Sequence, residues 1–106
     1  MGESLWTGTA NAEGDVNGDF SAYTLFAVTY NALGSSVHYT DVVVKNSLHG
    51  LNAINQDATD IVNFNSRAIL IQNTKFSLTA GAFAKISPAT QNAFEGCVVT
   101  EVRGLI

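Results

Sequence analysis

Short strand-like segments, separated by turn-forming residues about every eight to twelve positions, make up most of this chain. They cover residues 4–10, 23–30, 37–45, 67–72, 75–87 and 97–103. Within residues 75–87, Phe76, Leu78 and Ala80 alternate with polar residues until Gly81 interrupts the pattern, which predicts a strand with a bend or bulge. The spacing predicts a single all-β domain over residues 1–106, an antiparallel β-sandwich or jelly-roll-like fold.

Residues 51–62 do not fit this scheme unambiguously. Leu51, Ile54, Ala58 and Ile61 recur at a helical spacing. The intervening residues, however, are rich in Asn, Asp and Thr, which are poor helix formers. A short helical turn, a strand and an ordered loop therefore all remain open for this segment.

Charged residues are scarce, at 13% of the chain against 46% hydrophobic residues, where an ordinary soluble domain carries roughly 25% charge. Such a surface loses little hydration energy when a partner covers it, which favours an assembly component. The five Lys and Arg residues are scattered and the net charge is −4, which argues against nucleic acid as a partner. No segment approaches the roughly 20 apolar residues of a membrane-spanning helix.

The segment at residues 23–30 is apolar on both of its faces. Leu25 and Ala27 lie on one face, and Phe26, Val28 and Tyr30 lie on the other. A sandwich strand that is covered on one face only should alternate apolar and polar residues. We therefore expect a second subunit to cover the other face, with Phe26, Val28 and Tyr30 as candidate interface residues.

A motif at residues 15–19, DVNGD, resembles the start of a calcium loop of the EF-hand type. Such a loop needs Gly at its sixth position and a bidentate acid at its twelfth, where this chain has Phe20 and Phe26. A turn rich in Asp and Asn between two strands is the better interpretation, and no metal site is predicted here.

The remaining chemistry-bearing residues form no recognisable catalytic or metal-binding pattern. His38 and His49 lack zinc-site spacing, and we expect one on a strand and the other in a loop, hydrogen-bonded or at the surface. Cys97, in an apolar strand, reads as a buried small hydrophobe. No nucleophile elbow, phosphate-binding loop or selectable carboxylate pair is present in the sequence. The sequence therefore predicts neither an enzyme nor a cofactor.

Three residues are candidates for contact with a ligand. Trp6 and Tyr39 could stack on a sugar ring through their apolar faces, and His49 is the third candidate. For Trp6, which lies in a Leu-Trp-Thr strand, packing in the core or an interface is the favoured interpretation.

Both ends of the chain carry a pattern that resembles the C-terminal head domains of bacteriophage tail, baseplate or fibre proteins. It consists of LWTGTA at residues 5–10 with the aromatic strand at 23–30, and of KFSLT at residues 75–79 with VVTEVRGLI at residues 98–106. The resemblance implies a β-sandwich head domain at a virion tail or fibre tip. It also implies a homotrimer that attaches to the bacterial host surface, often to a saccharide. A virion structural or decoration protein without a receptor role and a bacterial carbohydrate-binding module are the alternatives.

Overall fold

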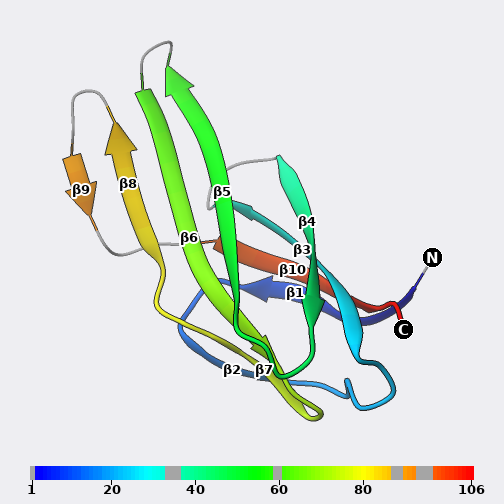
Figure 1. Cartoon of the computed structure of the whole chain (residues 1–106). Coiled ribbons are helices and arrows are strands. Elements are labelled where there is room, and N and C mark those ends of the chain that lie inside the picture. The colour runs from blue at the N-terminus through cyan, green and yellow to red at the C-terminus, as the bar shows by residue number, and fades with distance from the viewer. Residues whose placement is uncertain (1, 33–36, 59–60, 87–89, 93–96) are drawn as a thin grey trace.

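A computed structural model describes residues 2–32, 37–58, 61–86, 90–92 and 97–106. Every regular element in these ranges is a strand, and two antiparallel sheets pack together as the predicted β-sandwich (Figure 1). The ten described strands are β1 (Glu3–Ala10), β2 (Gly14–Asn17), β3 (Leu25–Ala32), β4 (His38–Val44), β5 (His49–Ala58), β6 (Ile61–Ile71), β7 (Lys75–Leu78), β8 (Ala82–Ile86), β9 (Thr90–Asn92) and β10 (Cys97–Gly104).

The two sheets share no strand. Sheet A has the order β1-β10-β3-β4, so that the first and last strands are neighbours and β1 and β4 form its two edges. Sheet B has the order β2-β7-β6-β8-β9, with β5 paired to the other side of β6. Figure 1 shows β5 and β6 running past the end of sheet A, which agrees with the elongated extents of 46 × 25 × 20 Å.

The centre of the core is a set of aromatic side chains between the sheets. We call Trp6, Phe20, Tyr23, Phe26 and Phe76 the aromatic cluster. The Phe20 ring lies 6.0 Å from both Phe26 and Phe76 in edge-to-face geometry, and Trp6 lies 5.0 Å from Phe76. The three Phe side chains are fully buried, so this cluster draws its stability from apolar area removed from water.

The predicted subunit-interface residues lie in this chain's own core, and that prediction is wrong. Phe26 and Val28 are fully buried and Tyr30 is 3% exposed, because sheet B of the same chain covers their face of β3. The opposite face of β3, with Leu25, Ala27 and Thr29, points outward and is half-buried. A second apolar face does exist on this strand, but it is the one with Leu25 and Ala27.

The described part of the ambiguous segment, residues 51–58 and 61–62, is strand, so the helical alternative is wrong there. Its first part belongs to β5, which pairs with β6 from His49↔Ile69 onward. The Asn and Asp residues that disfavour a helix thus lie in a long antiparallel hairpin. The predicted strand at residues 67–72 is the C-terminal half of β6, which begins at Ile61.

The interruption predicted at Gly81 is confirmed, because β7 ends at Leu78 and β8 begins at Ala82.

The motif at residues 15–19 is partly a turn and partly a strand. Asp19 forms the expected Asx turn, with its Oδ1 accepting hydrogen bonds from Ser21 N at 3.1 Å and Ser21 Oγ at 2.6 Å. Asp15 instead lies on β2, where its carboxylate accepts bonds from Lys75 and Ser77 of β7. None of the described residues forms a helix with the length and apolar character needed to cross a membrane.

Candidate functional site

Four polar or aromatic side chains meet where strands β3 and β4 of sheet A face strand β5 of sheet B. We call Tyr30, Tyr39, Asp41 and His49 the polar cluster. The β3–β4 register places Tyr30 opposite Tyr39 and Val28 opposite Asp41, so all of these side chains point toward sheet B. His49 begins β5 and approaches from sheet B. The polar cluster therefore joins β3 and β4 of sheet A to β5 of sheet B.

Hydrogen bonds and one ring stack hold the polar cluster together. Asp41 Oδ2 lies 2.9 Å from His49 Nε2 and 3.1 Å from the Tyr30 hydroxyl, which is also 3.2 Å from the carbonyl oxygen of Asn52. The Tyr39 hydroxyl donates to the Ile54 carbonyl at 2.6 Å. The Tyr30 and Tyr39 rings stack with centroids 5.6 Å apart. Each bond between β4 and β5 therefore also fixes the separation of the sheets.

The electrostatics of the polar cluster favour a neutral tyrosine. Burial, and then the charge of Asp41, raise the pKa of Tyr30 to about 12. Tyr30 is therefore a stable hydrogen-bond donor at neutral pH. Asp41 and His49 keep about a third of their side-chain surface exposed, at 29% and 34%. This arrangement can brace two sheets and offer polar groups at its rim.

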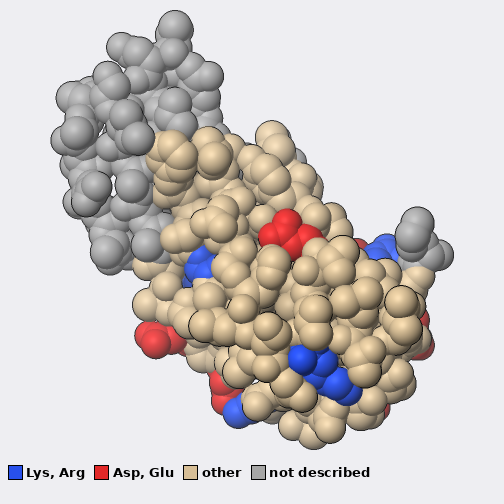
Figure 2. Space-filling view, in the orientation of Figure 1, with Lys and Arg blue, Asp and Glu red and all other residues tan. Residues whose placement is uncertain are grey.

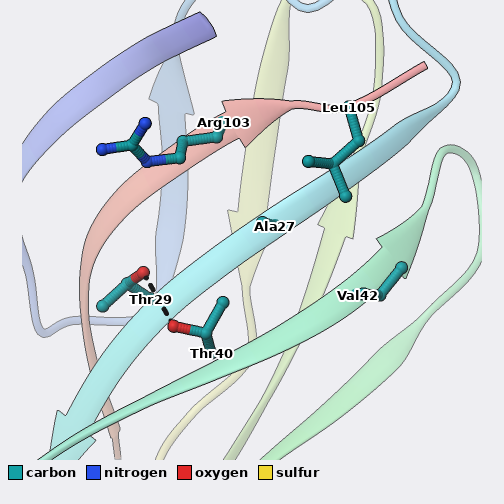
Figure 3. A pocket seen from close by; sticks show the side chains of 6 residues that line it. All are labelled: Ala27, Thr29, Thr40, Val42, Arg103 and Leu105. Carbon is teal, nitrogen blue, oxygen red and sulfur yellow. Dashed lines mark hydrogen bonds between the residues drawn. The ribbon is translucent and has the colours of Figure 1, made fainter. Parts of the chain in front are cut away.

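Sheet A carries an open depression on its outward face. Figure 3 shows its walls, which come from the two central strands, the edge strand β4 and the C-terminal segment. We call this the outer depression; it has a volume of about 520 Å³, is open to solvent, and is lined by Ala27, Thr29, Thr40, Val42, Arg103 and Leu105. The hydroxyls of Thr29 and Thr40 lie 3.2 Å apart. Arg103 Nε is 3.2 Å from Glu101 Oε1, which anchors the guanidinium at one wall.

Arg103 is the one charged residue among the described residues that line the outer depression. Lys, Arg, Asp and Glu occupy small, separated areas of the face seen in Figure 2, and most of its described surface is uncharged. Val42 and Val44 on β4 are more than half exposed, at 56% and 54%. The scarcity of charge in the sequence thus corresponds to an outward face of β4 on which Thr40, Val42 and Val44 carry no charge.

The structure brings together two of the three predicted ligand contacts. Tyr39 and His49 both belong to the polar cluster, whereas Trp6 is half-buried against Phe76 in the aromatic cluster. His38 lies on β4 and His49 on β5, so the expectation of one histidine in a loop is wrong. The residues of the outer depression were missed, although the alternation in residues 23–30 separates Ala27 and Thr29 from the core face.

Two further core residues carry polar groups. Cys97 is fully buried, as predicted, with Sγ 3.4 Å from the carbonyl oxygens of Leu51 and Asn65, and burial raises its pKa to about 11. Arg67 is 5% exposed, and its Nε and Nη1 have no hydrogen-bond partner among the described residues. No group of three His, Cys, Asp or Glu side chains within the described ranges could hold a metal ion.

Comparisons with known proteins give no relative for this chain. No family model matches it, and no curated protein or solved structure is similar to it.

Proposed function

We propose that this chain is a virion domain of a phage tail or fibre tip, which assembles with copies of itself and attaches to a saccharide of the bacterial host surface. The resemblance of both chain ends to phage head domains motivates the proposal. The observation that carries it is the outer depression, an open and mostly uncharged hollow built on a rigid sheet.

The lining of the outer depression suits a sugar. A pyranose ring presents apolar C–H faces and several hydroxyls, which need apolar contacts and neutral hydrogen-bond donors and acceptors. Val42 and Leu105 supply the apolar surface, and the hydroxyls of Thr29 and Thr40 supply donors and acceptors.

The proposed role is binding without catalysis. Its partners are other copies of the chain, a trimer by the resemblance, and a host-surface glycan. The exposed apolar residues on β4, Val42 and Val44, support association because they can be covered with little loss of hydration energy.

The test is an array of bacterial cell-wall saccharides, combined with light scattering. The intact chain should bind a saccharide, and Thr40→Val should weaken binding about fivefold, since one hydrogen bond to a neutral group contributes about 1 kcal/mol. Thr9→Val, an exposed position on β1, is the matched control and should leave binding unchanged.

The outcomes separate the proposal from its alternatives. A monomer that binds no saccharide on the array would overturn it. An oligomer without saccharide binding would identify a structural or decoration protein, and a monomer that binds saccharides would identify a carbohydrate-binding module.

A further inference from the structure

The two edges of sheet A are built differently. The β3–β4 register runs without a shift through seven consecutive pairs, from Leu25↔Val44 to Asn31↔His38. The β1–β10 register shifts twice, between Ser4 and Trp6 and between Thr7 and Ala10. Bulges twist an edge away from incoming strands, and a regular edge remains able to pair. Edge strand β4 is therefore the edge of sheet A that is open to pairing.

The hydrogen-bond pattern shows which backbone groups of β4 face outward. Lys45 N donates to Thr24 O at 3.0 Å, which makes this a hydrogen-bonded pair. In an antiparallel ladder such pairs alternate, so Val43, Asp41 and Tyr39 bond toward β3. The backbone groups of Thr40 and Val42 then point to the free edge, where the described residues offer them no backbone partner.

The side chains of β4 do not protect this edge. Natural sheets block an open edge with Lys, Pro or an inward-pointing charge that a second strand would bury. Residues 38–44 contain no Lys or Pro. The one charge, Asp41, already has partners in the polar cluster, His49 and Tyr30. Val42 and Val44 stand beside the open edge and are more than half exposed.

We propose that β4 pairs antiparallel with β4 of a second copy of this chain, which joins the two copies of sheet A into one continuous sheet. The inference rests on the assembly part of the proposed function and adds a two-fold contact to the three-fold contact that the resemblance implies. Pairing centred on Val42 places it opposite the partner subunit's Val42, and places Thr40 opposite the partner subunit's Val44. Asp41 then faces the partner subunit's Val43, so no two like charges are opposed.

The same strand fits itself better than it fits a charged segment, because the outward side chains that would pair, Thr40, Val42 and Val44, carry no ionisable group. Pairing in the plane of the sheet leaves the outward face uncovered. The outer depression of each copy would then remain open, and the two depressions would lie on one side of a shared sheet. A contact between identical edges is two-fold, so it closes at two copies and is separate from any three-fold contact.

Light scattering on the full chain tests the contact, with Val44→Lys as the disrupting variant. Val44 lies outside the outer depression, so this substitution charges the edge without changing the saccharide-binding walls. We expect the intact chain to have twice its monomer mass or an even multiple of it. Val44→Lys should raise the dissociation constant of the two-fold contact about tenfold, because it replaces the cross-strand pair of Val44 with the partner subunit's Thr40, which the two-fold contact contains twice.

Thr7→Lys on the bulged edge β1 is the matched control, since Thr7 is also exposed on sheet A. It should keep the mass of the intact chain, and thermal melts should show both variants folded. A Val42→Cys variant treated with a short bis-maleimide should give a covalent dimer, and Thr7→Cys should not. The native thiol of Cys97 is buried and would not interfere.

A monomeric intact chain, or equal masses for Val44→Lys and Thr7→Lys, would overturn the proposed contact. A monomeric intact chain would also contradict the assembly part of the proposed function, whereas an oligomer with equal masses for both variants would overturn this contact alone. Saccharide binding by a chain whose mass does not respond to Val44→Lys would overturn this inference and leave the proposed function standing.

Discussion

The aromatic cluster and the polar cluster occupy the same inter-sheet space but are held in different ways. In the aromatic cluster, Phe20, Phe26 and Phe76 are fully buried and touch edge to face, with hydrocarbon on all sides. In the polar cluster, Tyr30 and Tyr39 also stack, yet each hydroxyl is bonded to an atom of another strand. The aromatic cluster fills the volume between the sheets. The hydrogen bonds of the polar cluster fix how the two sheets are aligned.

The difference shows how a charge-poor sandwich fixes its two sheets relative to each other. Apolar contact is nondirectional, so the aromatic cluster stabilises packing without fixing one alignment of the sheets. The bonds from Tyr30 and Tyr39 to the backbone of β5 are directional, and they hold at one separation and one register. Stability should therefore depend most on the aromatic cluster, and the geometry of the β4–β5 side most on the polar cluster.

Removing the central ring of the aromatic cluster should have the largest effect. Phe76→Ala should lower the free energy of unfolding by about 3–5 kcal/mol, because it leaves a cavity against Phe20 and Trp6. Trp6→Ala should cost about half as much, since Trp6 is only half-buried. Denaturant melts measure both. Equal losses for the two variants would contradict the assignment of Phe76 to the centre of the cluster.

Overfilling the same cluster should have a smaller effect. A Cβ at Gly104 would overlap the Tyr23 ring, so Gly104→Ala must displace that ring. We expect a loss of about 1–3 kcal/mol in denaturant melts. Gly50→Ala is the control, because its nearest neighbour would lie at 3.8 Å, an ordinary contact distance. A neutral Gly104→Ala would mean that the Tyr23 ring is free to move.

The polar cluster should respond to the loss of one hydroxyl. Tyr30→Phe keeps the ring stack and removes the bonds to Asp41 and Asn52, which should cost about 1–2 kcal/mol at neutral pH. A pKa of about 12 in the folded chain, against roughly 10 in the unfolded chain, means that folding favours the protonated Tyr30. Its contribution is complete below pH 10 and is lost between pH 10 and pH 12.

Unfolding experiments between pH 9 and pH 12 measure this effect as a difference between two proteins. The intact chain should lose about 2 kcal/mol more than Tyr30→Phe across that window. Other groups that titrate there, including Cys97, are common to both proteins and cancel. Parallel curves for the two proteins would show that Tyr30 does not carry the alkaline sensitivity.

The smallest effect should come from a hydrogen bond that lies at the surface. Thr29→Val keeps the shape of the side chain and removes the 3.2 Å contact with Thr40 in the outer depression. We expect a loss below about 1 kcal/mol, as for other cross-strand pairs. A double-mutant cycle with Thr40→Val isolates the pair energy. If the Thr29–Thr40 pair energy were as large as the loss of unfolding free energy in Tyr30→Phe, burial would not make the buried polar contact stronger than the exposed one.

Most strands could be predicted from the sequence because alternation and turn residues are local signals. The break at Gly81 was predicted in this way and is confirmed. The assignment of residues 51–62 needed the partner strand, because their Asn-rich pattern has no strong local preference and β6 decides it. The two apolar faces of residues 23–30 were found, but which face the second sheet covers depends on the packing of the whole chain.

Only part of the candidate site could be predicted from the sequence. Tyr39 and His49 were singled out for their side-chain chemistry, and the structure places both in the polar cluster. Their connection through Tyr30 and Asp41 arises from the register of β3 with β4 and from the crossing to β5. Such contacts between distant segments leave no mark in composition or periodicity. Trp6 was a candidate of the same kind, and packing against Phe76 gave it a different role.

The pairing of the first and last strands has a mechanical consequence. Because β1 and β10 are antiparallel and Glu3 pairs with Gly104, the two ends of the chain leave the sheet at the same place (Figure 1). Tension applied between the ends would load one pair of hydrogen bonds at a time and peel β1 from β10. Strands pulled from opposite ends would instead share the load. A sandwich with this geometry resists force best when it is attached through one end only, so that no force acts between its two ends.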